Sequence, residues 1–269
     1  MSKVAAIQMA SGPSVDANLL EAGRLIDLAK SQDAELAVLP ENFPIMGLKE
    51  EDKVKVREPF GDGEIQEFLQ EKAVRSQIWL LGGTIPLVCD DPNKIYAASI
   101  LYNPQGEVVA RYDKIHLFDV TLVDSNESYC ESETIASGDQ LVVADTPFGK
   151  LGLAVCYDLR FPEMFRALLD KGAEIFALPS AFTSVTGAAH WECLVRARAI
   201  ENLSYVIAAN QGGFHKNGRT TYGDSMVVDP WGHVLNRLSK GAGVVMAELD
   251  HQFLTTTRKN FPAIDHRKF

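Results

Sequence analysis

The sequence lacks the cysteine and histidine patterns that mark metal centres and disulfide frameworks. Its four cysteines, Cys89, Cys130, Cys156 and Cys193, lie far apart and include no C-x-x-C pair. This spacing disfavours both a zinc framework and a disulfide-stapled scaffold. The six histidines form no H-E-x-x-H pattern, so a zinc-peptidase type of site has no support either. We therefore expect no metal site.

The sequence also lacks a long apolar segment and an excess of positive charge. Its longest mostly apolar segment, residues 78–88, is far shorter than the roughly 20 residues that a membrane helix needs. Residues 1–10 are typical of a first strand rather than of a signal peptide. Asp and Glu number 36 against 26 Lys and Arg, and the net charge of -10 repels a phosphate backbone. We expect a soluble cytoplasmic protein that binds neither membranes nor nucleic acid, although a local Arg or Lys could still bind a small anion.

Nothing in the sequence divides the chain into parts. Gly and Pro are spread evenly and no Ser/Gly-rich linker is present, so we predict a single domain over residues 1–269. No G-x-G-x-x-G follows the first strand, which argues against a dinucleotide-binding fold. Hydrophobic patterns in the first third of the chain predict strands at 4–10, 35–40 and 78–86, and helices at 18–30 and 64–75.

Three later segments have the pattern of β-hairpins. They span residues 97–109, 141–155 and 225–235, and each turns at an x-Pro-x-Gly sequence. Proline presets φ at the second turn position, and glycine suits the exit of a type I turn. Hairpins combined with alternating strands and helices favour an α/β domain in which two mixed sheets pack together with helices outside. A single doubly wound sheet is the alternative.

Residues 33–41 and 172–180 resemble each other. Each segment carries Ala-Glu, and each continues as an apolar strand that ends in Leu-Pro. A duplicated β-α-β element explains this likeness. Chance similarity between two buried strands explains it nearly as well.

Cys156 ends an apolar strand at residues 151–155, and Pro162 follows at a position typical of a helix start. A helix N-terminus and nearby cations lower the pKa of a thiol, so this placement favours a nucleophile. The strand–turn–helix arrangement is similar to the elbow that carries the serine of many hydrolases. The alternative is a small buried apolar side chain, which is what most free cysteines are.

Two charged residues also lie where strands are predicted to end. Glu41 follows the apolar run 35–40, and Lys114 follows a hairpin strand. With a cysteine they form a set suited to acyl transfer, because a carboxylate can accept the thiol proton and an ammonium can stabilise an oxyanion. Both could equally be solvated surface charges. His116 and His190 compete with Glu41 as the base, so the residue pattern alone leaves the base unassigned.

Three motifs, in this order, resemble those of the nitrilase superfamily of carbon–nitrogen hydrolases. They are L-P-E at residues 39–41, Y-D-K-I-H-L at 112–117 and G-L-A-V-C-Y-D at 152–158, and the likeness covers nearly the whole chain. The resemblance implies a four-layer α-β-β-α sandwich of two mixed sheets flanked by helices. It also implies a homodimer or a larger homo-oligomer that assembles through the helical faces.

The resemblance further implies the catalytic roles. Cys156 is then the nucleophile, and Glu41 rather than a histidine is the base. Lys114 and a backbone N–H, which we assign to Tyr157, hold the oxyanion. A second glutamate, Glu131, supports Lys114 or orients the substrate. The implied enzyme hydrolyses carbon–nitrogen bonds other than peptide bonds through a thioester, without a metal or organic cofactor.

Within the superfamily, the sequence is most similar to the branch of deaminated glutathione amidases and ω-amidases. We expect a small carboxylate-bearing substrate whose terminal carboxamide is hydrolysed to acid and ammonia, and we favour deaminated glutathione. Activity as an ω-amidase on α-ketoglutaramate, as a carbamoylase or as a nitrilase is the alternative. Two departures are Asp224, where such relatives often carry histidine, and a tail that ends at Phe269, short of the usual extension. The shared stretches include residues 114–120, 154–163, 187–192 and 226–232.

Three further residues are candidates for binding the substrate. A guanidinium binds a carboxylate bidentately, so we expect Arg160 to bind the anionic group, unless it forms a salt bridge with a neighbouring carboxylate. By resemblance Phe182 and Thr186 line the pocket. Their alternative roles are packing and the capping of a turn.

Overall fold

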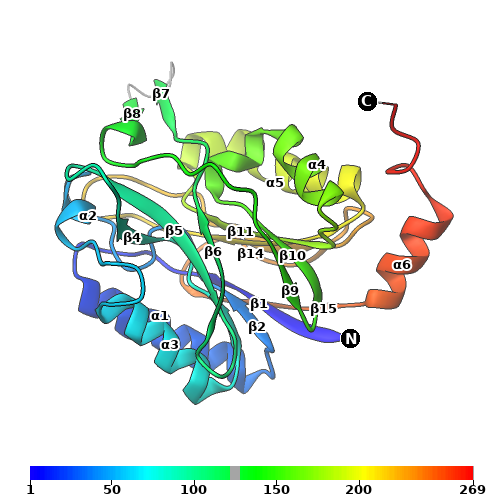
Figure 1. Cartoon of the computed structure of the whole chain (residues 1–269), viewed down its shortest axis with the longest axis horizontal. Coiled ribbons are helices and arrows are strands. Elements are labelled where there is room, and N and C mark those ends of the chain that lie inside the picture. The colour runs from blue at the N-terminus through cyan, green and yellow to red at the C-terminus, as the bar shows by residue number, and fades with distance from the viewer. Residues whose placement is uncertain (122–127, 269) are drawn as a thin grey trace.

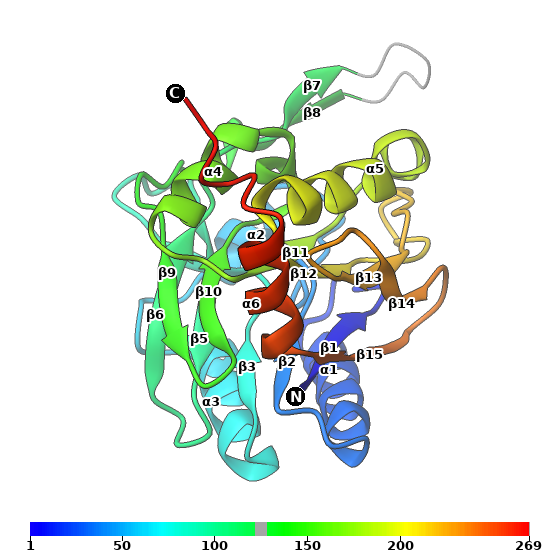
Figure 2. The same ribbon diagram turned by 90° about the vertical axis from the view of Figure 1, so that its right-hand side faces the viewer.

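The computed structural model describes residues 1–121 and 128–268, where two sheets pack face to face with helices on both outer sides (Figures 1 and 2). The first sheet contains β1 (Ser2–Gln8), β2 (Leu36–Val38), β3 (Trp79–Leu81), β4 (Ile85–Val88), β5 (Ile95–Tyr102), β6 (Val108–Asp113) and β15 (Gly243–Leu249). Its order is β15-β1-β2-β3-β5-β4, with β6 also paired to β5. The second sheet contains β9 (Val143–Thr146), β10 (Gly149–Leu153), β11 (Ile175–Ser180), β12 (Tyr205–Asn210), β13 (Ser225–Val228) and β14 (Val234–Leu238). Its order is β14-β13-β12-β11-β10-β9.

Each sheet is covered by its own pair of helices, which gives the predicted α-β-β-α order of layers (Figure 1). Ser14 caps the first of these helices, because its hydroxyl accepts a hydrogen bond from the backbone N–H of Ala17. The first sheet is covered by α1 (Val15–Ser31) and α3 (Glu64–Ser76), and the second by α4 (Pro162–Asp170) and α5 (Ser184–Asn202).

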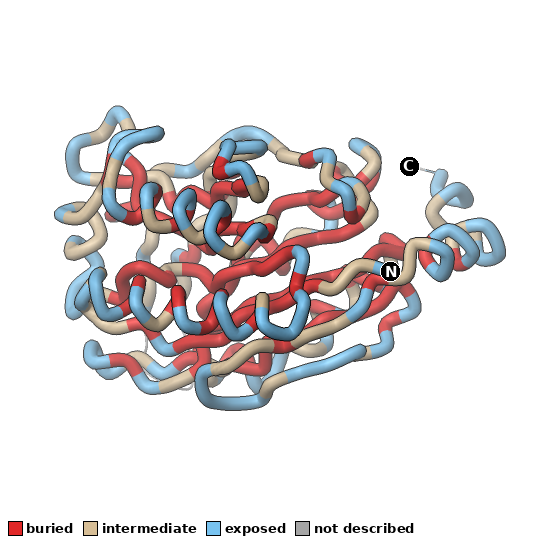
Figure 3. Tube along the Cα trace, turned by 90° about the horizontal axis from the view of Figure 1, so that it is seen from below, coloured by how far each residue is buried: buried red, intermediate tan, exposed pale blue. Residues whose placement is uncertain are grey.

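Alternation along β1 shows how the layers are joined. Val4 and Ala6 lie in the core between the sheets, whereas Ala5 and Ile7 pack in the core under α1 and α3. All four residues are fully buried, as expected for a strand that is covered on both faces. Figure 3 shows the outcome, with buried chain in the middle layers and exposed chain on the outer faces of the helices.

The strand pairing agrees with the predicted hairpins and differs from prediction at one place. The pairs β5–β6, β9–β10 and β13–β14 confirm the three hairpins. The strand predicted at 78–86 is wrong, because it is divided into β3 and β4, which both pair with β5. Leu81 lies opposite Leu101 and Ile85 opposite Ala98, so this segment advances four residues while its partner advances three. The chain bulges between the two strands.

The two similar sequence segments occupy equivalent places in the two sheets. Strands β2 and β11 each lie between two parallel neighbours. Glu35 and Glu174, just before these strands, each accept a hydrogen bond from a backbone N–H of the preceding neighbour strand, at Lys3 and Lys150. The likeness is therefore structural as well. Both Leu-Pro sequences lie at carboxyl ends of parallel strands, where sheet folds expose functional groups.

The remaining elements lie outside the layers. Helix α6 lies at one end of the molecule and precedes the C-terminal tail (Figure 1). No helix in the described part of the chain is long and apolar enough to cross a membrane. These elements are the helices α2 (Asp52–Lys55) and α6 (His251–Asn260), the 3₁₀ helices η1 (Glu131–Glu133) and η2 (Cys156–Arg160), and a small sheet of β7 (Asp119–Thr121) and β8 (Ser128–Cys130).

Candidate active site

Glu41, Lys114 and Glu131 are far apart in sequence but meet in a buried ion-pair cluster. The Nζ atom of Lys114 lies 2.7 Å from Oε1 of Glu41 and 2.7 Å from Oε2 of Glu131. The Lys114 side chain is fully buried, and that of Glu41 is 3% exposed. One ammonium therefore donates to two carboxylates in a largely buried cluster, and the formal charges of the three side chains sum to one negative charge.

The position of Glu41 depends on the bulge between β3 and β4. Gly83 in this bulge has a φ of +54°, and a β-carbon there would lie only 2.1 Å from the carbonyl oxygen of Pro40. Only glycine permits this approach without strain. The backbone carbonyl of Glu41 accepts a hydrogen bond from Nε2 of Gln211 at 3.0 Å. The residue is thus held from both sheets.

Lys114 and Glu131 are also held by backbone contacts. Lys114 follows β6 directly, and its N–H donates to the carbonyl of Ala97 at 3.1 Å. Glu131 is the first residue of η1, and its Oε2 accepts a second hydrogen bond from the N–H of Phe118 at 2.8 Å. Both charged groups are therefore positioned before any ligand arrives.

Cys156 lies on a sharp turn between β10 and α4. It is the first residue of η2, is 8% exposed and has a φ of +47°, which is uncommon for a residue other than glycine. Pro162 is the first residue of α4, as predicted. The turn places Cys156 in the wall of a cavity that Glu131 also lines, and the charges of Glu41, Lys114 and Glu131 all act on the pKa of its thiol.

Asp158 holds this turn against the lysine segment. Its fully buried carboxylate accepts hydrogen bonds from the Tyr112 hydroxyl at 2.6 Å, the Val155 N–H at 2.8 Å and the His116 N–H at 3.1 Å. Nδ1 of His116 lies 2.7 Å from the same carboxylate. Because Tyr112 and His116 flank Lys114 in sequence, this network fixes the turn of Cys156 relative to the lysine.

The ion pairs shift the pKa values of the charged residues. Burial acts to lower the pKa of Lys114, but the carboxylates of Glu131 and Glu41 outweigh it and hold this pKa well above its ordinary value. Burial acts to raise the pKa of Glu131, but Lys114 and Lys53 outweigh it and lower this pKa. Both groups are therefore charged at neutral pH.

The pKa of the Cys156 thiol is raised well above its ordinary value, first by burial and then by the charge of Glu41. Lys114 and a hydrogen bond from the backbone of Ala181 oppose this rise but do not reverse it. The expected lowering of the thiol pKa is therefore wrong for the free protein. Its reason is physical: burial and a carboxylate remote in sequence outweigh the local helix start and the lysine. The resting thiol is protonated and lies near a carboxylate.

The residues predicted to bind substrate all line one cavity with Cys156, which we call the inner cavity. Phe182 is placed by its backbone N–H, which donates to Oδ1 of Asn210 at 3.0 Å. Thr186 lies in the first turn of α5, and its N–H donates to the hydroxyl of the capping residue Thr183 at 3.3 Å. The inner cavity is lined by Phe118, Glu131, Cys156, Tyr157, Arg160, Ala181, Phe182, Thr183, Thr186 and Arg219.

The guanidinium of Arg160 is available to an anion in the inner cavity. It lies over the rings of Phe182, at 5.3 Å, and Tyr157, at 5.8 Å. Nη1 lies 3.2 Å from Nδ1 of His190. Arg160 forms no salt bridge with any residue that the structure describes, so the alternative of a structural ion pair is wrong.

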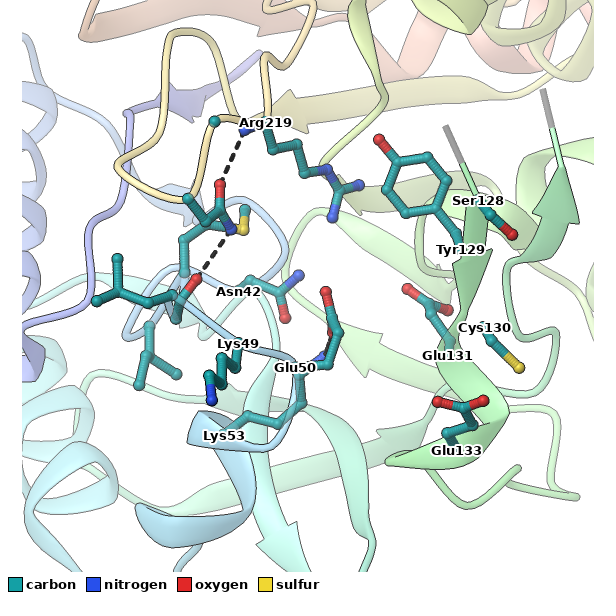
Figure 4. A pocket seen from close by; sticks show the side chains of 16 residues that line it. Asn42, Lys49, Glu50, Lys53, Ser128, Tyr129, Cys130, Glu131, Glu133 and Arg219 are labelled. Atoms are coloured by element: carbon teal, nitrogen blue, oxygen red, sulfur yellow. Dashed lines mark hydrogen bonds and ion pairs between the residues drawn. The ribbon is translucent and has the colours of Figure 1, made fainter. Parts of the chain in front are cut away.

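A larger cavity of about 640 Å³, the outer cavity, adjoins the inner one (Figure 4). This volume is typical of sites for small molecules. Glu131 and Arg219 line both cavities and therefore lie at their junction. The outer cavity is lined by Asn42, Ile45, Met46, Gly47, Leu48, Lys49, Glu50, Lys53, Ser128, Tyr129, Cys130, Glu131, Glu133, Asn217, Gly218 and Arg219.

Arg219 was missed in the sequence, and no motif there would have identified it. It lies in the loop 211–224 between β12 and β13, which has no strand or helix periodicity. The loop is joined to a distant segment by a hydrogen bond from Nδ2 of Asn217 to the carbonyl of Gly47 at 2.9 Å. Only this tertiary contact brings Arg219 to the site.

Of the competing residues, Cys130 lines the outer cavity and His190 contacts Arg160, whereas His116 belongs to the network of Asp158. The ring of His116 is bonded to Asp158 and stacks on Phe161 with the ring centroids 3.7 Å apart. Cys130 and Cys193 are exposed. Among the described residues, no group of three or more His, Cys, Asp or Glu side chains could hold a metal ion.

Asp224 lines neither cavity. Its carboxylate forms an ion pair with Arg237, with Nε and Oδ1 2.8 Å apart, and hydrogen bonding to this carboxylate raises the pKa of Arg237. Its backbone carbonyl accepts a hydrogen bond from the indole of Trp191 at 2.8 Å. The departure at this position is therefore compensated locally and adds no net charge to the pocket.

The fold and the site define a class of enzyme. A family model described as "Carbon-nitrogen hydrolase" matches residues 3–259. The chain therefore belongs to the carbon–nitrogen hydrolase family, as the motifs predict, and it is a hydrolase that acts on carbon–nitrogen bonds other than peptide bonds.

Individual relatives make the comparison more specific. The deaminated glutathione amidase of Synechocystis sp. is 43% identical over 268 residues, which cover 98% of this chain and 97% of that protein. The NitFhit protein of C. elegans has a TM-score of 0.93 and 37% identity, and the match covers 99% of this chain but only 65% of NitFhit. Saccharomyces cerevisiae Nit3, a member of branch 10 of the nitrilase superfamily, has a TM-score of 0.89 and 35% identity over 100% of this chain and 97% of Nit3. These similarities confirm the predicted fold.

Proposed function

We propose that this protein is a deaminated glutathione amidase whose catalytic residues are Glu41, Lys114 and Cys156. The observation that carries the proposal is the buried ion-pair cluster of Glu41, Lys114 and Glu131, whose charges act on the thiol of Cys156 in the wall of the inner cavity. Relatives named deaminated glutathione amidase, from Synechocystis, Yersinia enterocolitica and Homo sapiens, support the choice of substrate with identities of 40–43%.

In the first half of the proposed reaction, the sulfur of Cys156 attacks the amide carbonyl while Glu41 accepts the thiol proton. The raised pKa of the thiol fits this order, because the proton leaves only as the new bond forms. Two donors stabilise the oxyanion: the ammonium of Lys114 in the ion-pair cluster, and the backbone N–H of Tyr157 at the start of η2. Glu41 then gives its proton to the departing amine, and a thioester is left on Cys156.

In the second half, Glu41 takes a proton from a water molecule that attacks the thioester. The acid product leaves, and the thiol regains its proton. Glu131 accepts a hydrogen bond from Lys114 and keeps the ammonium in place throughout. Because the pKa of Glu131 is lowered, its carboxylate stays ionised and keeps Lys114 charged. Every step uses side chains and backbone of this chain, so the proposed chemistry requires no metal or organic cofactor.

The acyl part of the substrate is proposed to occupy the inner cavity. Its carboxylate would bind Arg160, and its apolar chain would lie against Tyr157 and Phe182, with Thr186 beside them. Deaminated glutathione has only secondary amides, so its hydrolysis releases an amine. Release of ammonia, which the sequence analysis expects, requires a primary amide such as that of the ω-amidase substrate α-ketoglutaramate. The leaving group therefore separates the two candidate functions.

A substrate panel tests this proposal. Purified protein would be assayed with deaminated glutathione, α-ketoglutaramate, an N-carbamoyl amino acid and a nitrile, and the released amine or ammonia would be quantified. The highest kcat/KM is expected for deaminated glutathione. A clear preference for one of the other three compounds would overturn the proposed substrate.

Cysteine variants test the nucleophile. Cys156→Ala is expected to fold and to lose turnover, whereas Cys130→Ala and Cys193→Ala, at exposed positions, are expected to keep most of it. Hydrolysis by Cys156→Ala at the wild-type rate would remove the basis of the mechanism. Circular dichroism of each variant would verify that it is folded.

We further propose that the protein is cytoplasmic and forms a homodimer or a larger homo-oligomer, as the resemblance implies. Light scattering coupled to gel filtration would measure the mass of the assembly against the 29.5 kDa of the chain. A mass of one chain at micromolar concentration would refute the oligomer.

A further inference from the structure

The junction between the two cavities is formed by two charged residues with different partners. Glu131 already accepts hydrogen bonds from Lys114 and from the backbone of Phe118. Arg219 forms no ion pair within the described part of the chain, although it lies beside the catalytic cluster. Its positive charge acts on the carboxylate of Glu50 across the outer cavity without forming an ion pair with it.

The guanidinium of Arg219 is held in place but has unused donors. Nη2 donates to the carbonyl of Ala181 at 2.8 Å, and the guanidinium lies 5.0 Å from the ring centroid of Tyr129. The Nε atom is buried and has no hydrogen-bond partner among the described residues. A buried donor without a partner is unfavourable, so such a group in a cavity wall indicates a place where a ligand supplies the acceptor.

The direction of Arg219 indicates which part of a ligand it meets. Figure 4 shows its side chain reaching into the outer cavity from the loop 211–224, with Tyr129 beside it and Glu131 nearby. Arg160 lines only the inner cavity. Two guanidinium groups thus serve two connected cavities, with Cys156 in the wall of the inner one.

The outer cavity contains charges of both signs, because Glu50 and Glu133 line it together with Lys49 and Lys53. Glu50 is paired with Lys53 at 2.6 Å. Lys49 is exposed at the rim and adds positive charge there. A planar carboxylate suits the guanidinium better than a single ammonium, because two parallel N–H donors meet its two oxygens.

We propose that Arg219 binds the carboxylate-bearing leaving group of the substrate in the outer cavity and thereby selects long amides over primary amides. This inference rests on the proposed function, because deaminated glutathione carries a carboxylate on each side of the scissile amide. The acyl carboxylate belongs to the inner cavity and the distal carboxylate to the outer one. Arg219 is then a specificity-determining residue that is separate from the catalytic set.

The test compares two substrates with the same acyl group. Deaminated glutathione has a long leaving group, whereas α-ketoglutaramate releases only ammonia. Arg219→Gln is expected to lower kcat/KM for deaminated glutathione at least about tenfold, the size of one lost charged hydrogen bond, and to change that for α-ketoglutaramate by less than about threefold. Arg219→Lys should lie in between, because it keeps the charge but loses the fork.

Two controls make the comparison specific. Lys216→Gln removes an exposed positive charge from the same loop at a position that lines neither cavity, and it should behave as wild type. A second control uses deaminated glutathione whose terminal carboxylate is converted to an amide. Wild type should hydrolyse this amide more slowly than the free acid, whereas Arg219→Gln should hydrolyse the two compounds equally well. Such loss of discrimination shows that residue and carboxylate act as a pair.

The possible failures are distinguishable. Equal losses for both substrates in Arg219→Gln refute this assignment, because Arg219 would then act on the acyl group or on the fold. A wild-type preference for deaminated glutathione that Arg219→Gln retains also refutes it, and leaves the proposed function standing. Wild-type turnover of deaminated glutathione no faster than that of α-ketoglutaramate refutes both the proposed function and this inference.

Discussion

Replacing Glu41 by Gln is expected to separate the reactivity of the thiol from turnover. The substitution keeps the shape of the side chain and an oxygen that can accept from Lys114, but it removes the negative charge near Cys156. This charge is the second cause of the raised pKa of the thiol, after burial. The variant should therefore hold more thiolate at neutral pH and yet lack the proton acceptor.

The magnitudes follow from electrostatics. Two unit charges about 5 Å apart, in a medium with an effective dielectric constant of about 20, interact by about 3 kcal/mol. Half of this energy already corresponds to about a tenfold change in an equilibrium, so alkylation of Cys156 by iodoacetamide should become at least about tenfold faster at neutral pH. Loss of a general base typically lowers the rate about 10²–10⁴-fold, and amide turnover should fall by this amount.

The assay follows iodoacetamide incorporation at Cys156 by mass spectrometry, and amide hydrolysis, on the same preparations. Cys130→Ala and Cys193→Ala in the background of both proteins remove the exposed thiols that would compete for the reagent. Slower alkylation together with slower turnover would refute the reasoning, because Glu41 would then act by supporting the structure. Unchanged turnover would show that another group is the base.

Three further substitutions test how the site is built. Tyr112→Phe removes two hydrogen bonds, one of them to a carboxylate, and should lower the free energy of unfolding in urea by about 2–4 kcal/mol. The control is Tyr102→Phe, because the hydroxyl of Tyr102 has no hydrogen bond to any described residue. This variant should change the free energy of unfolding by less than about 0.5 kcal/mol. Equal losses for the Tyr112 and Tyr102 variants would contradict the network around Asp158. Glu131→Gln should destabilise the protein by roughly 1–3 kcal/mol at neutral pH. Because the pKa of this carboxyl is lowered from 4.5 in the folded state, the difference from wild type should shrink as the pH falls below 4.5, and a constant difference would count against the ion pair. Gly83→Ala should destabilise the protein and reduce turnover more than Gly61→Ala. Both glycines have positive φ, but an added β-carbon would clash at Gly83 and would meet no atom within 4 Å at Gly61. Thermal unfolding curves that coincide for the two variants would contradict the close approach at Gly83.

The parts of the fold that depend on local chemistry could be predicted from the sequence. The x-Pro-x-Gly turns define their hairpins because the turn geometry is set by those residues themselves, and Pro162 begins α4 for the same kind of reason. The bulge at Gly83 could not be predicted, because the carbonyl that requires glycine there belongs to Pro40, which follows β2 and is distant in sequence.

The candidate site shows the same division. Glu41, Lys114 and Cys156 could be named as candidates because each follows a predicted strand, but only the resemblance of three motifs to a known family assigned their roles. The direction of the thiol pKa could not, because it depends on burial and on a carboxylate far away in sequence. Arg219 was missed for a related reason, since a loop without periodicity gives no indication of the cavity to which tertiary contacts bring it. The prediction of one domain over residues 1–269 stays a prediction.

The central claim is that amide hydrolysis passes through a thioester on Cys156, and it is tested most directly by identifying the acyl-enzyme. Protein mixed with excess deaminated glutathione would be quenched in acid within one turnover, digested and mapped by mass spectrometry. The account predicts that the acyl group of the substrate is attached to the peptide that carries Cys156. Attachment to any other residue, under conditions in which product forms, would contradict it.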